Sequence, residues 1–430
     1  MELFSFKAKP IGAAMRHLLA VLLCCFAVGV YAQSKTAQKG YDVCDQFYKG
    51  IGKDIFWFSE DSQLSTRLLR ITDSLPYWGI REDKFDFPVA PADSSLSHEQ
   101  LAMLDRQCTR TFITLMRDVF EGSDIAGLIS NDEVSDKFVG RTDSTLTDIL
   151  VNWSRNTDIR KLLQSLEPAD SDYVVLKAGL QQALADSNAQ RIKAVTASLN
   201  IYKWVRHFNF DKYIIVNIPT AQLTAFKGGS KMNMKVVVGK PATKTPRFST
   251  WCDKVILYPY WNVPARIARK ELVPMFKRDR SRIDKMNMQI LSKDGKKIDP
   301  NSLDWSALGK GYFPYSIRQC TGCDNSLGVI KFDLTDPFSV YLHDTNYKLA
   351  FGSDDRYLSH GCIRVSEPIE LGNFILENRL DSNFLKACYK DQEPTIITVT
   401  PRVPVFVVYM TAVPENDSVT YYEDVYHLFR

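Results

Sequence analysis

Two patterns of apolar residues divide the chain near residue 210. From residue 41 to residue 208, apolar side chains recur three and four positions apart, which is typical of amphipathic helices. From residue 213 onward they alternate with polar residues in short runs, which is typical of half-buried strands. The chain is therefore predicted to be α+β, with a helical N-terminal domain followed by a mostly-β domain.

Five helices are predicted in the first half. Pro168 separates two of them, and Asp170 or Ser171 is a candidate N-cap for the second of that pair. We interpret the last helix as a link between the two halves and the others as packing elements. The predicted helices cover residues 64–71, 101–120, 148–166, 173–185 and 189–208.

The second half is predicted to form a sandwich or barrel, because turn residues follow each short strand. Gly228 and Gly229 mark one hairpin turn. One helix is predicted over 368–380. The predicted strands cover residues 213–218, 222–226, 232–238, 254–258, 329–332, 339–342, 395–400 and 403–410.

The segment 262–320 interrupts this strand pattern. It holds an internal Pro274 and a charged run over 277–280. A long insertion inside a compact domain is unusual unless it has a function, so we interpret it as a lid. Four aromatic residues are candidates for the lining of the lid, although packing is the commoner role for each: Trp261, Trp305, Tyr312 and Tyr315.

The N-terminus predicts export. Basic residues precede an apolar run over 18–30, and Ala32 is a suitable position for cleavage. Residues 1–32 are therefore predicted to be a signal peptide, with a periplasmic mature chain that has no membrane-spanning segment. The mature chain keeps 51 of the 54 basic residues and 49 of the 50 acidic ones. This balance does not indicate a nucleic-acid partner, and it predicts no clear steering toward an acidic polymer.

Seven cysteines follow residue 32, and an odd number leaves at least one thiol unpaired in an exported protein. Cys320 and Cys323 form a Cys-x-x-Cys sequence, for which three interpretations stay open: two loop thiols, a local disulfide, or half of a zinc site. Zinc has the least support, because no two further ligands lie at a suitable spacing. The seven are Cys44, Cys108, Cys252, Cys320, Cys323, Cys362 and Cys388.

The candidate chemistry lies in the segment 343–365, which reads HDTNYKLAFGSDDRYLSHGCIRV. A cysteine attacks as thiolate, and a nearby imidazole can hold it in that form. His360 lies two residues before Cys362, and a turn can bring His343 close to it. Gly361 leaves room beside the thiol, and the N–H groups around it are candidates for holding an oxyanion. The alternative is that Cys362 is a small buried core residue, but the polar surroundings are atypical of a core strand.

This segment resembles the signature of the L,D-transpeptidases, bacterial enzymes that cross-link the cell wall with a cysteine nucleophile. The resemblance extends over about residues 45–400 and is strongest from residue 205. It is closest to the larger, envelope-localised type. The residues that match the signature are His343, Ser359, His360, Gly361, Cys362, Ile363 and Arg364.

The resemblance implies a domain plan. The signal peptide is followed by a helical scaffold domain (33–188), a linking helix (189–210) and a sandwich-like or barrel-like catalytic domain (211–410) that carries a capping insertion (262–320). A C-terminal tail (411–430) ends the chain.

The resemblance also implies a two-step acyl transfer that needs no metal or organic cofactor. His343 keeps Cys362 as thiolate, which attacks a stem peptide of peptidoglycan and releases D-Ala. The thioester then passes to the diamino-acid amine of a second stem, which gives a 3→3 cross-link. Carbapenem-type inhibitors are expected to acylate Cys362.

Further residues are assigned by the same resemblance. Asp344 is expected to orient His343 through its side chain or its main chain, and His360 to orient the loop rather than to transfer a proton. Arg364 is a candidate either for binding a substrate carboxylate or for a structural ion pair. The remaining candidates for the substrate pocket are Ser359, Asn346 and Tyr341.

Three alternative functions use the same residues. Water could take the thioester, which gives an L,D-carboxypeptidase, or a lysine of an envelope protein could take it, which attaches that protein to the wall. The third alternative is an inactive wall-binding scaffold. Serine-hydrolase, P-loop and dinucleotide-binding motifs do not stand out in the sequence.

Overall fold

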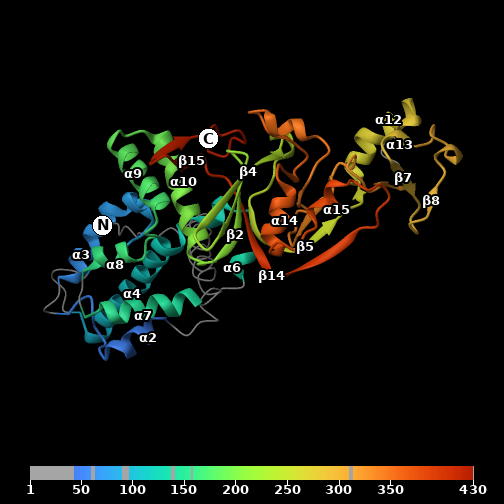
Figure 1. Cartoon of the computed structure of the whole chain (residues 1–430). Helices are drawn as coiled ribbons and strands as arrows, with labels where there is room; N and C mark the ends of the chain where they lie inside the picture. The colour runs from blue at the N-terminus through green and yellow to red at the C-terminus, as the bar shows by residue number, and fades with distance from the viewer. Residues whose placement is uncertain are drawn as a thin grey trace, which may run out of the picture. The chain divides into compact units, whose positions relative to one another are not determined.

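The computed structural model describes residues 43–59, 63–89, 96–136, 141–155, 158–308 and 313–429. The predicted signal peptide (1–32) and Tyr312 lie outside these ranges. The chain forms two compact units (Figure 1). The first unit draws on Met1–Ser65, Phe87–Ile113 and Gly140–Thr157, and the second on Thr66–Asp86, Thr114–Val139 and Asp158–Arg430.

The first unit is helical and contains a buried carboxylate. Asp105 accepts the backbone N–H groups of Phe56, Trp57 and Phe58 at 2.7 to 3.0 Å, so it satisfies donors that would otherwise be buried without partners. Trp57 packs edge-on against Phe112, with 5.0 Å between the ring centroids. The helices α2 (Val43–Ile51) and α7 (Arg141–Trp153) belong to this unit, whereas α3 (Leu64–Ile71) and α4 (His98–Glu121) each begin in it and end in the second unit.

The predicted helix over 148–166 is wrong, because two helices occupy this stretch. The helix α7 ends at Trp153, and α8 (Ile159–Ser165) begins after Asp158, whose carboxylate caps it by accepting the Lys161 N–H at 3.1 Å. The boundary between the two units falls inside the gap. The apolar residues keep a helical spacing across this boundary, so the sequence pattern did not show that the two helices belong to different units.

The second unit is built on a closed sheet. Its strands follow the order β5-β10-β11-β13-β4-β3-β2-β14, and β14 pairs again with β5, which closes the ring. Two short strands, β1 (Asn131–Asp132) and β12 (Tyr357–Ser359), add to β5 and β4. The ring strands are β2 (Lys212–Asn217), β3 (Gln222–Lys227), β4 (Ser230–Gly239), β5 (Phe248–Leu257), β10 (Ile330–Leu334), β11 (Leu342–His343), β13 (Ile363–Val365) and β14 (Thr395–Val408).

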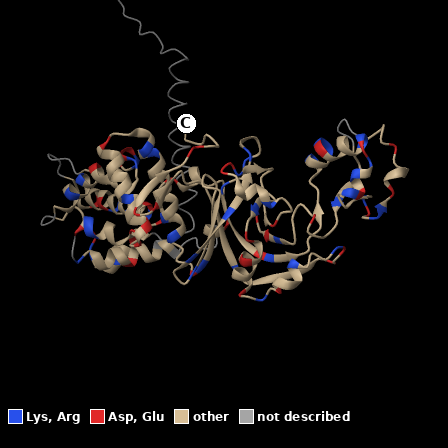
Figure 2. Ribbon diagram, turned by 45° about the horizontal axis from the view of Figure 1, so that its top comes forward, with Lys and Arg blue, Asp and Glu red and all other residues tan. Residues whose placement is uncertain are grey.

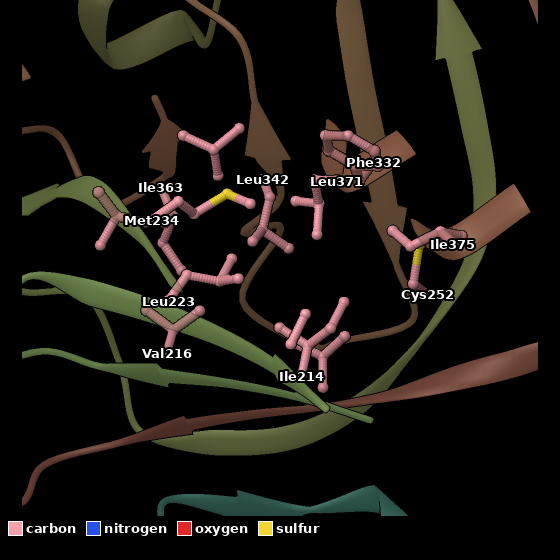
Figure 3. Close-up of a cluster of buried hydrophobic side chains, with 14 of the residues drawn as sticks. Ile214, Val216, Leu223, Met234, Cys252, Phe332, Leu342, Ile363, Leu371 and Ile375 are labelled. Carbon is pink, nitrogen blue, oxygen red and sulfur yellow. The ribbon is translucent and has the colours of Figure 1, made fainter. Parts of the chain in front are cut away.

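Alternate side chains of these strands fill the interior of the ring. Figure 3 shows Ile214, Leu223 and Met234 with Leu342 and Ile363 in one buried cluster. Removing a buried side chain of this size typically costs about 2–5 kcal/mol. The same alternation turns the intervening residues of β10, β11 and β13 to the opposite face, and this face carries the candidate site.

Helices pack on the ring away from the face that carries the candidate site. The helix α9 (Ser171–Ala185) begins after Asp170, whose carboxylate accepts the Tyr173 N–H, so the predicted cap is confirmed. The helix α10 (Ala189–Arg206) is a buried packing element as well as a link, because Trp204 packs edge-on against Phe406 of β14 at 5.2 Å. The remaining helices of this unit are α5 (Ile125–Leu128), α6 (Glu133–Asp136), α14 (Pro368–Leu376) and α15 (Ser382–Lys386), and those of the insertion are α11 (Ala265–Ile267), α12 (Val273–Arg278) and α13 (Ser281–Lys285).

The residues after 410, predicted to be a tail, belong to the second unit. The strands β15 (Ala412–Glu415) and β16 (Ser418–Tyr421) form a hairpin whose Ala412 and Val419 pack in a cluster with residues of α9 and α10. Tyr426 is fully buried and donates its hydroxyl to the Gly239 carbonyl. This segment is therefore part of the packed core.

Two strand predictions differ from the structure. The strand predicted over 339–342 is reduced to β11, because the Asp336 carboxylate accepts the N–H groups of Phe338 and Val340 and so forms a turn there. The two strands predicted over 395–400 and 403–410 form the single strand β14, with an irregularity between Thr398 and Val403.

The insertion has a small sheet and a core of its own. The strands β6 (Trp261–Asn262), β7 (Met288–Leu291), β8 (Lys297–Ile298) and β9 (Ser316–Gln319) pair in the order β6-β9-β7-β8. Trp305 is buried against Phe276, and its indole donates to the Pro300 carbonyl at 2.7 Å, so it is a packing residue.

None of the helices within the described ranges is long and apolar enough to cross a membrane.

Candidate active site

Three adjacent strands bring the candidate residues together. His343 of β11 is the register partner of Lys331 on β10 and of Arg364 on β13. These side chains share the face opposite the core residues Phe332, Leu342 and Ile363. Because alternate residues of a strand share a face, Cys362 lies on the Arg364 side and Tyr341 on the His343 side. The Ile363 N–H donates to the Tyr341 carbonyl at 3.1 Å, which holds the two segments in register.

Cys362 has a half-buried thiol in a mixed environment. Its sulfur lies 4.0 Å from the Ser339 carbonyl. Burial raises the pKa of the Cys362 thiol above its ordinary value, while the contact with Tyr341 and the charge of Lys331 act in the opposite direction. Of the cysteines outside a disulfide within the described ranges, Cys362 is the one that is not buried.

His343 is held as a neutral base. Its side chain is 5% exposed, and Nδ1 lies within hydrogen-bond distance of the Asp344 carbonyl oxygen, which can only accept. The proton therefore resides on Nδ1, and Nε2 is left with a lone pair. Burial and the nearby Arg364 charge lower the pKa of His343 to about 3.

Burial disfavours the charged form of each group, so it raises the pKa of the Cys362 thiol and lowers the pKa of the His343 imidazole. Both directions favour the neutral thiol and the neutral imidazole over a thiolate–imidazolium pair. That His343 keeps Cys362 as thiolate stays a prediction.

Asp344 acts on His343 through its main chain. Its carboxylate accepts the N–H groups of Val329 at 2.9 Å and Thr345 at 2.7 Å, and it also pairs with Lys348. Gly328 has a φ of +58°, and a Cβ at that position would lie 2.1 Å from Asp344 Oδ2. The carboxylate is thus occupied in fastening the loop that precedes β10, and the carbonyl is the group that contacts the imidazole.

The loop before Cys362 is braced from within. The Ser359 hydroxyl accepts the Gly361 N–H at 3.1 Å and donates to the Cys362 carbonyl at 2.6 Å. Ser359 is 3% exposed and its hydroxyl is used within the loop, and its direct contact with a substrate stays a prediction. Gly361 has a φ of +125°, which side chains rarely adopt, and its carbonyl accepts the Thr245 hydroxyl at 2.8 Å.

His360 faces the insertion. Its Nε2 lies 2.9 Å from Oε1 of Glu271, which belongs to the π-helical turn η4 (Ala268–Leu272). Turns of this kind occur often at functional sites. The insertion therefore contacts the segment that carries Cys362 through His360.

Arg364 lies on β13, directly after the Cys362 segment, and Asn346 lies in the loop after β11. Within the described ranges no carboxylate forms an ion pair with Arg364, and its binding of a substrate carboxylate stays a prediction. Asn346 is exposed and donates to the Asp324 carbonyl at 2.9 Å.

The cysteine pairing differs from each interpretation of the Cys-x-x-Cys sequence. Cys323 forms a disulfide with Cys388, 65 residues later in the chain, while Cys320 is reduced and buried. A local disulfide between Cys320 and Cys323 is therefore wrong. Sequence spacing cannot indicate a partner that the fold brings from a distant segment.

Three residues near the thiol were not predicted to contribute. Glu271 and Gly328 left no local signal. Lys331 did leave a signal in the sequence, because it is a basic residue between Ile330 and Phe332, which both enter the core. In the structure its Nζ lies 4.4 Å from the Tyr341 ring centroid.

A cavity of about 740 Å³ lies away from this cluster. It is lined by residues of the β2–β3 turn, the segment before β12 and the C-terminal segment, among them Thr220, Arg356 and Glu423. Neither Cys362 nor His343 lines it.

Two stretches of the chain match known protein families. Residues 211–397 match the family described as the L,D-transpeptidase catalytic domain. The chain carries an L,D-transpeptidase catalytic domain. Residues 42–180 match a second family, described as a scaffold domain. Both matches lie inside the domain ranges predicted from the sequence, and the family resemblance is confirmed.

A curated relative from Haemophilus influenzae, named "Putative L,D-transpeptidase", is 31% identical over 252 residues. The match covers 58% of this chain and 48% of the relative, so the chain spans about half the length of the relative that it matches.

Among solved structures, the L,D-transpeptidase from Mycobacterium smegmatis is 14% identical, with a TM-score of 0.24 over 46% of this chain and 58% of that one. The catalytic domain of the Enterococcus faecium enzyme, acylated by ertapenem, is 15% identical, with a TM-score of 0.21 over 46% of this chain and 96% of that one. Values this low give no information about individual residues, and the family assignment rests on the sequence matches.

Proposed function

We propose that this protein is a periplasmic peptidoglycan L,D-transpeptidase with Cys362 as nucleophile and His343 as base. The observation that carries the proposal is the shared face of β11 and β13, where a half-buried thiol and a buried neutral imidazole lie on adjacent strands. The family match supports the reaction class, and the N-terminal charge and apolar run support export.

In the first step the thiol attacks the carbonyl that joins the third residue of a stem peptide to D-Ala. The thiol proton passes to Nε2 of His343 as the carbon–sulfur bond forms. The imidazolium then returns this proton to the leaving amine of D-Ala, and a thioester remains on Cys362. The fixed Nδ1 proton keeps Nε2 available throughout, because the Asp344 carbonyl holds the other nitrogen.

In the second step the amine of a second stem's diamino acid attacks the thioester. His343 accepts a proton from that amine and passes it to the departing Cys362 sulfur, which restores the neutral pair and leaves a 3→3 cross-link. The oxyanion of both steps is assigned to the backbone N–H of Cys362, since the Gly361 N–H is already donated to Ser359.

The charged groups beside the thiol suit a substrate with carboxylates. We assign Arg364 to a carboxylate of the donor stem, because its guanidinium faces the site without an acidic partner in the described part of the chain. Tyr341 is assigned to the thiol itself, whose pKa it lowers, and Asn346 to the edge of the site.

Mass spectrometry of the mature protein with a disaccharide-tetrapeptide tests the proposal, with Cys362→Ala as the matched control. A cross-linked dimer that has lost one D-Ala, absent in the variant, is the expected result. A tripeptide product alone would favour the L,D-carboxypeptidase, in which water takes the thioester. The absence of any product from the folded protein would favour protein attachment or the wall-binding scaffold.

Carbapenem binding follows from the same chemistry. A carbapenem presents a strained acyl group to the thiol, so we expect one covalent adduct per chain, on the peptide that contains Cys362. Peptide mapping after incubation with ertapenem would locate the adduct, and an adduct on Cys320 instead would contradict the assignment.

A further inference from the structure

The insertion carries the positive charge of this chain. Residues 262–320 contain 13 Lys and Arg against 6 Asp and Glu, whereas the whole chain contains 54 against 50. The net charge of the insertion is therefore +7, and the net charge of the rest of the chain is −3. Because the net charge of the whole chain is nearly balanced, no steering toward an acidic polymer was predicted from it. The net charge does not show that the positive charge is concentrated in the insertion.

The charge is on the outside of the insertion. All eleven Lys and Arg between Arg266 and Lys297 are exposed. Figure 2 shows basic residues gathered on the segment that Figure 1 labels α12, α13, β7 and β8. Six acidic residues cannot neutralise thirteen basic ones, whatever pairs they form. We call the exposed Lys and Arg between 266 and 297 the basic surface.

The basic surface begins next to the nucleophile. Glu271, one residue after Lys270, reaches His360 at 2.9 Å, and His360 lies two residues before Cys362. A polymer that lies along the basic surface would therefore pass beside the Cys362 thiol. A position beside the reacting group favours the substrate polymer over a lipid surface or a nucleic acid.

We propose that the basic surface binds the polymeric wall strand through its carboxylates and holds successive stem peptides beside Cys362. The inference rests on the proposed function, since it takes the wall polymer as substrate. Peptidoglycan stems carry free carboxylates at regular intervals along the glycan, which matches a surface with many separated cations. A short soluble stem contacts the pocket but is too small to span this surface.

Charge-removing substitutions on the basic surface test the proposal. The variant is K277Q/R278Q/R280Q/K285Q, which keeps side-chain length at four exposed positions. The matched control is K49Q/R67Q/R70Q/R160Q, which removes four exposed charges elsewhere in the chain. Each set is made in the active protein for turnover and in Cys362→Ala for binding.

Binding is measured by co-sedimentation with purified peptidoglycan sacculi between about 50 and 200 mM salt. We expect at least about a fivefold weaker binding at low salt for the variant, a smaller salt dependence, and no change for the control. Turnover of the soluble disaccharide-tetrapeptide is expected to stay within about twofold of the parent protein, while cross-linking of sacculi falls.

The outcomes separate the two proposals. Unchanged binding of sacculi by the variant, or an equal loss in the control, would overturn the role of the basic surface. A loss of binding to phosphatidylglycerol vesicles but not to sacculi would also overturn it, in favour of a membrane surface. Failure of the parent protein to turn over the soluble tetrapeptide would refute the proposed function instead.

Discussion

The two histidines of the Cys362 segment lie in different surroundings. His343 is 5% exposed, and its Nδ1 is held by a backbone carbonyl. The side chain of His360 is 42% exposed and contacts a Glu271 side chain that is 51% exposed. A buried imidazole with one nitrogen fixed is prepared for proton transfer, whereas an exposed one competes with water for each contact. One short signature therefore holds two histidines in different surroundings, one buried and proposed as the base and one exposed and in contact with the insertion.

Replacing each histidine by Gln gives the sharpest test of this difference. We expect His343→Gln to slow acylation of Cys362 by about 10²- to 10⁴-fold, because the base is lost. His360→Gln is expected to cost less than about tenfold, because no proton passes through it. Acylation is followed by mass spectrometry over time, with thermal unfolding as a control for folding. A comparable loss in both variants would remove the distinction.

The pH dependence of the thiol is the next largest effect. Because the pKa of His343 is lowered to about 3, the imidazole stays neutral as pH falls from 7 to 5. The rate of acylation should therefore stay constant over this range, whereas it would fall if the base were a histidine with an ordinary pKa. Because the pKa of Cys362 is raised, alkylation by iodoacetamide should increase above the ordinary thiol pKa of about 8.5.

Tyr341→Phe sharpens the pH test. Because Tyr341 lowers the pKa of the thiol, loss of its hydroxyl should move the alkylation midpoint of Cys362 to still higher pH. A midpoint near neutral pH in the parent protein would restore the thiolate–imidazolium pair that the sequence predicted.

The next prediction tests whether Asp344 orients His343 through its main-chain carbonyl or through its carboxylate. Asp344→Asn keeps the carbonyl, so we expect kcat to fall by less than about tenfold, whereas loss of an orienting carboxylate can cost about 10⁴-fold. Gly328→Ala should destabilise the fold by about 1–3 kcal/mol, since the new Cβ would meet the Asp344 carboxylate at a residue with positive φ. Turnover and urea unfolding measure the two effects. A severe kcat loss in Asp344→Asn with normal stability would show that the carboxylate acts on His343.

The exposed pair is expected to give the smallest effect. Glu271→Gln removes the charge that faces His360, and exposed pairs of this kind contribute about 0–1 kcal/mol. We expect less than about 1 kcal/mol of change in unfolding free energy and unchanged acylation by ertapenem. A large fall in acylation would mean that the contact with the insertion positions Cys362.

Local patterns predicted most of the helices and strands. The strands over 213–218, 222–226 and 232–238 are confirmed as β2, β3 and β4, because apolar alternation and the Gly228–Gly229 turn act between close neighbours. The helix over 148–166 failed because period alone cannot show that two successive turns belong to different units.

For the cysteines, too, local sequence predicted one part and the fold decided the other. The polar run around Cys362 pointed to the thiol, and the structure places His343 on the adjacent strand. The Cys323–Cys388 disulfide could not be predicted, because the two residues meet only after α15 and the loop before β10 have packed. The protonation of the pair could not be predicted either, because burial changes the pKa of both groups.

The sequence by itself determined the α+β organisation, the residues of the signature and the position of the insertion, since each depends on residue types at short spacing. Only the tertiary structure decided which carbonyl contacts His343, which cysteine Cys323 joins, and that burial raises the pKa of the Cys362 thiol and lowers that of the His343 imidazole. It also decided that the charges of the insertion lie on its outside, beside the nucleophile. These properties arise from distance and desolvation between segments far apart in the chain, and no local pattern encodes them.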